Sequence, residues 1–359
     1  MALTRGFDSL THLLTGSATV AAIVISQSVA VYAKTGEEVY QIAVPVTVQI
    51  NSDSGGGTGV IIAQDDNSAA AYINRGIARH NLKDYQGAIS DYDKALKIDP
   101  NYALAYYNRG VARGNLKDYQ GAISDYDKAL KIDPNYAAAY LNRGVARGNL
   151  KDYQGAISDF DKALKIDPND AAAYLNRGVA RGKLKDYQGA ISDYDKALKI
   201  DPNDASAYIN RGGARYNLKD YQGAISDYDK ALKIDPNYAA AYLNRGVARG
   251  NLKDYQGAIS DFDKALKIDP NYAAAYYNRG NARYNLKDYQ GAISDYDKAI
   301  KIDPNYADAY LNRGVALYMV GDKRKARGDW ETAAQLYRQQ GNEDDYKNVM
   351  DNIRNFTFD

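Results

Sequence analysis

Residues 69–102 read AAAYINRGIARHNLKDYQGAISDYDKALKIDPNY, and near-copies of this 34-residue segment fill most of the chain. The copies 103–136 and 239–272 differ at three of 34 positions. Apart from Pro45, the prolines are spaced 34 residues apart: Pro100, Pro134, Pro168, Pro202, Pro236, Pro270 and Pro304. A repeat of this length predicts an array in which each unit contacts only its neighbours, rather than a globular enzyme.

The composition excludes several classes of function. The net charge of +1 provides no strong field that would attract nucleic acid or an acidic membrane. The chain has no cysteine, which excludes disulfides and thiolate chemistry. Its two histidines, His12 and His80, are too few for a multi-histidine metal site and make a serine-type triad hard to build. We therefore expect no catalytic residues, no metal and no cofactor.

Each half of the 34-residue unit predicts one helix. Residues 69–82 are helix formers without proline, and Tyr72, Gly76 and Arg79 fall on one helical face. Residues 85–98 place four residues on one face at helical spacing: Ala88, Tyr92, Ala95 and Ile98. Pro100 ends this second helix, because proline disfavours helix in the residue before it. The unit is therefore a helix–turn–helix.

The unit resembles the tetratricopeptide repeat (TPR). That family has an aromatic at position 4, Gly at 8, Ala at 20, an aromatic at 24, Ala at 27 and Pro at 32. Here these are Tyr72, Gly76, Ala88, Tyr92, Ala95 and Pro100. The resemblance implies an all-α fold, a right-handed α-solenoid of eight units with a C-terminal capping helix at 342–356. The units are 69–102, 103–136, 137–170, 171–204, 205–238, 239–272, 273–306 and 307–340.

Charged residues recur at fixed places in each unit. Positions 7 and 11 hold arginine, first as Arg75 and Arg79, and the second helix carries Asp91 and Asp93. Two hypotheses stay open: a ladder of Arg–Asp pairs that ties the helices together, or a stripe of arginines that binds anions. The two aspartates are not a metal motif, because residues two apart on a helix point in divergent directions.

Two segments precede the array. In residues 1–33, an apolar stretch from Leu13 to Ala33 predicts an export signal, with an uncleaved membrane anchor or an accidental apolar terminus as alternatives. In residues 34–67, alternation over 42–50 and the strand-like 59–62 predict a β-hairpin. This hairpin weakly resembles the opening strands of trypsin-like and HtrA-like serine proteases. It is either the remnant of a truncated protease or a flexible linker.

The resemblance to TPR proteins implies a concave groove lined by the first helix of each unit, at positions 2, 5, 6, 9, 12 and 13. Position 6 is asparagine in all eight units: Asn74, Asn108, Asn142, Asn176, Asn210, Asn244, Asn278 and Asn312. These amides either pair with the backbone of an extended peptide, like the asparagine ladder of other long TPR superhelices, or bond within the repeat.

Selectivity in such a groove would come from positions that vary. Position 9 is mostly valine, but Gly213 and Asn281 interrupt the row. The candidate groove residues at positions 5 and 12 are Tyr107, Leu141, Leu175, Ile209, Leu243, Tyr277, Tyr216 and Tyr284. The groove lacks the lysines and arginines with which TPR co-chaperones clamp acidic C-termini, so we do not expect that function.

We expect an exported or membrane-anchored bacterial scaffold, not an enzyme, that binds protein or peptide partners in this groove. Nucleic acid is not an expected partner, and membrane contact is expected only through an uncleaved N-terminal segment. Two alternatives are a protease remnant without activity and an inert, recently duplicated array.

Overall fold

The computed structural model describes residues 68–355 and, before them, five short strands between residues 23 and 63. The described part of the chain contains 17 helices, labelled α2–α18. Sixteen of them form eight consecutive pairs: α2 (Ala69–Asn81) and α3 (Tyr85–Ile98), α4 (Ala103–Asn115) and α5 (Tyr119–Ile132), α6 (Ala137–Asn149) and α7 (Tyr153–Ile166), α8 (Ala171–Lys183) and α9 (Tyr187–Ile200), α10 (Ala205–Asn217) and α11 (Tyr221–Ile234), α12 (Ala239–Asn251) and α13 (Tyr255–Ile268), α14 (Ala273–Asn285) and α15 (Tyr289–Ile302), α16 (Ala307–Met319) and α17 (Lys323–Gln339). The last helix is α18 (Glu343–Asn355). The predicted helical array is confirmed.

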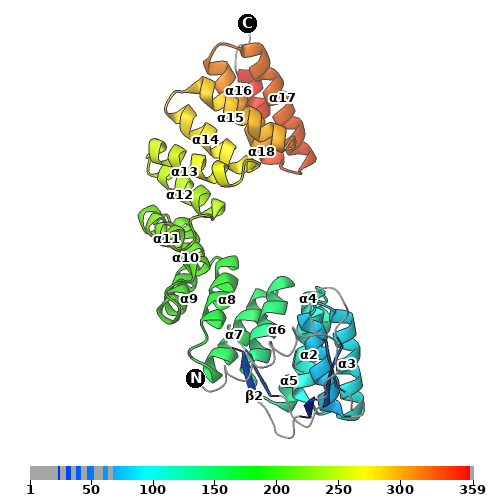
Figure 1. Ribbon diagram of the computed structural model, residues 1–359. Helices are drawn as coiled ribbons and strands as arrows, with labels where there is room; N and C mark the ends of the chain where they lie inside the picture. Colours follow the sequence, from blue (N-terminus) through cyan, green and yellow to red (C-terminus); the bar gives the residue numbers. More distant parts are fainter. Residues whose placement is uncertain are drawn as a thin grey trace, which may run out of the picture. The chain divides into compact units, whose positions relative to one another are not determined.

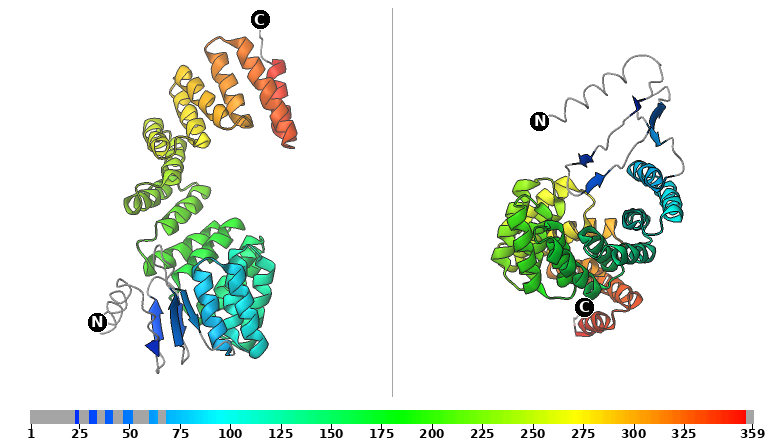
Figure 2. Two further views of the ribbon diagram at one scale, coloured as in Figure 1. Left: turned by 45° about the vertical axis from the view of Figure 1, so that its right-hand side comes forward. Right: turned by 90° about the horizontal axis from the view of Figure 1, so that it is seen from below.

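The helices belong to two compact units, residues 1–168 with α2–α7 and residues 169–359 with α8–α18. Within each unit the two helices of a pair pack against each other, and successive pairs stack in chain order (Figure 1, Figure 2). Each helix therefore contacts mainly its neighbours along the chain, as expected of a solenoid.

The strands are β1 (Ile23–Val24), β2 (Ala30–Ala33), β3 (Glu38–Gln41), β4 (Thr47–Asn51) and β5 (Val60–Ala63). β4 pairs antiparallel with β1 and with β5, while β2 pairs antiparallel with β3. Residues 1–22, 25–29, 34–37, 42–46, 52–59 and 64–67 lie outside the described residues, so the export signal and the protease resemblance stay predictions. No helix in the described part of the chain is long and apolar enough to span a membrane.

A short turn with a fixed backbone shape joins the two helices of each pair. Lys83 has a φ of 64°, in the left-handed region, and Asp84 then caps α3 by accepting a bond from the Gly87 N–H at 2.9 Å. The last pair places Gly321, φ 89°, in the same turn. Glycine adopts this conformation without steric cost.

The two helices of each pair approach most closely where a glycine faces an aromatic ring. A Cβ built on Gly144 would lie 2.6 Å from Cε1 of Phe160, which is too close for any real contact. The same closeness recurs at Gly76 with Tyr92 and at Gly314 with Trp330. These rings are buried, so the glycine at position 8 is required for the aromatic at position 24 to fill the core.

A buried aspartate locks each pair together. Asp91 is fully buried and accepts two bonds from Arg75, from Nε at 2.9 Å and from Nη2 at 2.8 Å. Arg79 adds an ion pair to Asp91 at 2.9 Å through Nη1. The two-pronged Arg–Asp bond recurs in all eight pairs, at Asp91, Asp125, Asp159, Asp193, Asp227, Asp261, Asp295 and Asp329.

Six of these arginines also bind an aspartate of the preceding pair. Arg109 binds Asp125 in its own pair and Asp93 in the pair before it. Burial lowers the pKa of Arg109, but the bonds and charges of Asp125 and Asp93 outweigh it, and the net pKa is raised. The charge of the arginine is therefore balanced by aspartates inside the array. This confirms the ladder hypothesis and not the anion-binding stripe.

The final helix covers the last pair. Val349 of α18 is 1% exposed and packs with Trp330, Ala333 and Tyr337 of α17. The first turn of α18 is acidic, with Glu343, Asp344 and Asp345. An apolar inner face and a charged outer face are what an array needs where it meets water.

Candidate functional site

Position 5 lies deeper than its sequence pattern predicted. Tyr107 is 2% exposed and packs with Tyr126, while Leu141 is 8% exposed. Placing these two residues in an accessible groove was wrong, because the first helix of each pair turns this position toward its partner helix. Four others are partly buried and pack against core residues: Leu175, Ile209, Leu243 and Tyr277.

The asparagines at position 6 follow a rule set by the pair before them. Where position 5 of that pair is tyrosine, the amide donates to its hydroxyl: Asn142 to Tyr107 at 2.8 Å and Asn312 to Tyr277 at 3.0 Å. Asn278, which follows Leu243, instead donates back to its own helix at 2.8 Å, to the carbonyl of Ala274. Asn176 does the same, and Asn210 and Asn244 are partly buried on α10 and α12.

The first two asparagines of the row are different. The Nδ2 atoms of Asn74 and Asn108 are buried and have no hydrogen-bond partner within the described part of the chain. Asn108 follows Ile73, which has no hydroxyl to offer. The row is therefore not uniform, although its sequence is.

Asn281 organises a polar cluster of side chains from α14, α15 and α16 in the second unit. Its Oδ1 accepts from the Tyr296 hydroxyl at 2.7 Å and from Asn312 Nδ2 at 2.9 Å. Asn312 also reaches Tyr277, so four side chains from α14, α15 and α16 are joined. Burial raises the pKa of Tyr296, with further contributions from Tyr277, Tyr284 and Asp295, so this hydroxyl stays a donor at neutral pH.

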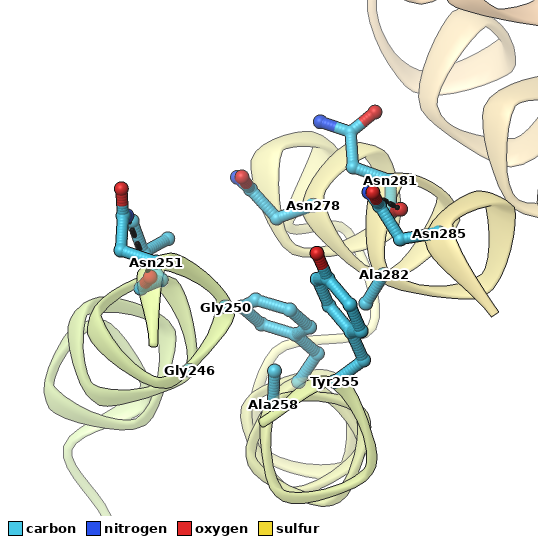
Figure 3. Close-up of a pocket in the computed structure, with 11 residues that line it drawn as sticks. Gly246, Gly250, Asn251, Tyr255, Ala258, Asn278, Asn281, Ala282 and Asn285 are labelled. Carbon is cyan, nitrogen blue, oxygen red and sulfur yellow. Dashed lines mark hydrogen bonds between the residues drawn. The ribbon is translucent and has the colours of Figure 1, made fainter. Parts of the chain in front are cut away.

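A pocket of about 200 Å³ lies between α12 and α14, over α13. Figure 3 shows Tyr255 rising from α13 between Asn251 on one side and Asn278, Asn281 and Asn285 on the other. The remaining lining residues are Gly246, Val247, Gly250, Ala258, Phe262 and Ala282.

A second pocket of about 300 Å³ adjoins it along the array. Asn281 and Asn285 line both pockets, and the second is completed by Tyr284, Tyr296, Asn312 and Val315. Among the residues that the structure describes, no charged side chain lines either pocket. The site is built from amides, phenols and apolar groups, so it offers hydrogen bonds and stacking without a charge.

The sequence pattern found only part of this site. It placed Asn278, Asn312 and Tyr284 in the groove, and it showed Asn281 as an interruption of the valine row. It missed Asn251, Asn285 and Tyr255. Position 13 could have indicated the two asparagines. The resemblance to TPR proteins implies that this position lines the groove, and it is asparagine in six of the eight units.

Family models for the tetratricopeptide repeat match residues 69–102, 103–136, 137–170, 171–204, 239–272 and 262–294, and a TPR repeat model matches 212–253 and 280–321. Together they cover more than half of the chain. No protein of curated function matches the chain.

Many solved structures are similar to this chain. A tetratricopeptide repeat protein from Parabacteroides merdae matches with a TM-score of 0.56 and 20% identity over 69% of this chain and 98% of that one. PilF from Pseudomonas aeruginosa matches with a TM-score of 0.52 and 22% identity over 58% and 94%. YrrB, described as a TPR protein with an unusual peptide-binding site, has 26% identity and a TM-score of 0.46 over 51% and 95%. The first two likenesses show the fold. TPR proteins are generally non-enzymatic, and their fold is typical of protein–protein interaction scaffolds. The chain belongs to the tetratricopeptide repeat family.

Proposed function

We propose that the second unit is a scaffold that binds an extended peptide of a protein partner on the face formed by α12, α14 and α16. The observation that carries this proposal is Asn281, which lines two adjoining pockets and binds Tyr296 and Asn312 in the wall of the second. Five other pairs have valine at its position: Val111, Val145, Val179, Val247 and Val315.

The chemistry of the face favours a neutral partner. Each asparagine amide carries both a donor and an acceptor, which suits the alternating N–H and C=O groups of an extended backbone. Asn278 and Asn285 use Nδ2 for bonds within their own helix, at 2.8 Å and 2.7 Å, which leaves their Oδ1 atoms for a ligand. A charged side chain in the pockets would lose its hydration without gaining an opposite charge. We therefore propose an uncharged peptide rather than an acidic tail.

The test is selection of extended peptides from an unbiased nine-residue array, with the full chain and its Asn281→Val variant compared. Valine is the residue that sibling repeats carry there, so the variant is expected to fold normally, which circular dichroism checks. We expect uncharged peptides to bind the wild type and to bind the variant at least five times more weakly. Equal binding by both proteins would overturn the proposal.

The chain offers a matched gain-of-function control in the first unit. Tyr107, Tyr126 and Asn142 reproduce the arrangement of Tyr277, Tyr296 and Asn312, with the same ring separation of 6.0 Å, but position 9 is Val111. His80 occupies the place that Gly250 leaves open beside Asn281, since its ring lies 5.1 Å from that of Tyr85. Val111→Asn combined with His80→Gly is therefore expected to add a second site for the selected peptides.

Two alternatives predict other outcomes. An inert, duplicated array would select no peptide at all. A working serine protease with a TPR tail would react with an active-site serine probe, whereas we expect this chain, like a remnant without activity, to stay unlabelled.

A further inference from the structure

Position 12 of the repeat is filled in some pairs and empty in others. In the fifth pair Tyr216 lies against Tyr221, with ring centroids 5.3 Å apart, and Asn251 of the next pair donates to its hydroxyl at 3.0 Å. Tyr284 lies against Tyr289 at the same separation. In the sixth pair the same position is Gly250, which has no side chain to fill this place.

The pocket beside Gly250 has the walls of the place that Tyr216 occupies. Tyr216 packs with Ala224, Tyr228 and Ala248. The residues 34 positions later, Ala258, Phe262 and Ala282, all line the pocket. The partners of the Tyr216 ring and hydroxyl, Tyr221 and Asn251, likewise correspond to Tyr255 and Asn285 of the pocket.

The backbone at Gly250 leaves this space open. A Cβ built on Gly250 meets no atom within 4 Å. Asn285 donates to the carbonyl of Asn281 at 2.7 Å, as Asn251 donates to that of Val247 at 3.0 Å. Asn251 uses its Nδ2 for Tyr216 as well, so the Nδ2 of Asn285 has a second hydrogen for the same purpose.

We propose that the pocket at Gly250 is a socket for a tyrosine side chain of the partner peptide, held in the way that the chain holds its own Tyr216. The phenol ring lies against Tyr255 and beside Phe262, and its oxygen accepts a bond from Asn285. This proposal rests on the proposed function and adds the side chain that the second unit recognises.

Both parts of a phenol contribute to binding. The ring gains from tilted aromatic contact in addition to burial of its apolar surface. The hydroxyl satisfies an amide hydrogen that the pocket otherwise leaves for water. A hydrogen bond of this kind changes affinity by about fivefold. Tyrosine should therefore bind best, phenylalanine about fivefold more weakly, and leucine more weakly again.

The test uses an acetylated and amidated seven-residue peptide with one central tyrosine among serine and glycine, together with its phenylalanine and leucine versions. Saturation-transfer NMR titrations with the full chain measure the affinities. Gly250→Tyr supplies the socket with the residue found at Tyr216 and Tyr284, so it fills the pocket without a foreign shape. We expect this variant to bind the tyrosine peptide at least ten times more weakly than the wild type does.

Gly114→Tyr is the control, because it makes the same change in the first unit, where position 9 of the next pair is Val145 instead of Asn281. It should leave the affinity within about twofold of the wild type, since the wild-type second unit keeps its socket. The socket proposal is overturned if Gly250→Tyr binds the tyrosine peptide like the wild type, if the leucine peptide binds as tightly, or if the tyrosine peptide does not bind.

The outcomes separate this proposal from the broader one. If array peptides still require Asn281 but Gly250→Tyr has no effect, the peptide face stands and the socket fails. If Asn281→Val has no effect on any array peptide, the proposed function fails, whatever the tyrosine peptide does.

Discussion

Asp261 and Asp263 lie two residues apart on α13, yet they bind arginines of different repeats. Asp261 is fully buried and binds Arg245 and Arg249 of its own pair. Asp263 is 54% exposed and binds Arg279 of the next pair at 2.5 Å. One aspartate therefore closes the pair, and the other couples neighbouring pairs along the array.

The two aspartates should differ strongly in their contribution to stability. Asp261→Ala leaves two arginines facing a buried space without their counter-charge, which costs about 3–5 kcal/mol. Asp263→Ala removes a largely exposed ion pair, which costs about 0.2–1 kcal/mol. Urea unfolding followed by circular dichroism measures both, and hydrogen exchange shows whether the loss is confined to the sixth pair. Equal losses would contradict this assignment.

Two glycines of α6 should respond to alanine in opposite directions. The Cβ of Gly144→Ala would lie 2.6 Å from Phe160, so the ring must move and about 1–3 kcal/mol of stability is lost. The Cβ of Gly148→Ala meets nothing within 4 Å. Alanine is better than glycine within a helix by about 0.5–1 kcal/mol, so this variant should be more stable than the wild type. Thermal unfolding measures the stability of the two variants against that of the wild type. Destabilisation of both would contradict the packing of α6 against Phe160.

The helix pairs were predictable because the information lies within one 34-residue unit. The predicted helix over 85–98 is α3, and the predicted helix over 69–82 is α2, which ends one residue earlier. Local features fix both: a proline that ends one helix and a polar turn that separates the two. Both features recur in almost every copy, so the prediction of two helices per unit does not depend on any single copy.

The site was less predictable because it depends on contacts between helices. Tyr107 lies in the core, and the periodicity of one helix does not tell whether position 5 faces the groove or the partner helix. Asn281 gains its role from Tyr296, fifteen residues away, and from Asn312, thirty-one residues away. The sequence marks Asn281 as unusual, but only the packing of three helices shows what it joins.

Because several tyrosines are buried, we expect the protein to unfold in alkali. Burial, as the largest cause, raises the pKa of Tyr194, Tyr228 and Tyr296 above the ordinary value of 10.0. The folded state therefore holds these protons more tightly than the unfolded state. The contribution of these tyrosines to the free energy of unfolding should be constant below about pH 10 and should fall as the pH rises further.

Absorbance at 295 nm and circular dichroism, followed together, check this expectation. The exposed tyrosines should ionise first without loss of helix, and the last tyrosines should ionise only as the helices unfold. The matched variant Tyr194→Phe, which has the residue found at Phe160 and Phe262, should lose less stability between pH 10 and 12 than the wild type. Ionisation of all tyrosines while the helices remain would contradict the prediction.

Asn108 and Asn142 should differ although they hold the same position in neighbouring repeats. Asn142 donates to the Tyr107 hydroxyl, while the buried Nδ2 of Asn108 has no partner. Asn142→Ala loses a hydrogen bond, whereas Asn108→Ala removes an unsatisfied polar group. We expect Asn142→Ala to be the more destabilising by about 1 kcal/mol in urea unfolding.

The missing partner of Asn108 can be supplied, which makes the argument sharper. Ile73 occupies the place that Tyr107 holds in the next pair, and both are 2% exposed. Ile73→Tyr should offer a hydroxyl to Asn108 in the geometry of the Tyr107–Asn142 bond. The gain should vanish when Asn108 is also alanine, because the larger ring then has no amide to bind. A double-mutant cycle with Asn108→Ala is expected to give a favourable coupling of about 1 kcal/mol. A coupling near zero would mean that tyrosine at position 5 does not orient the asparagine row.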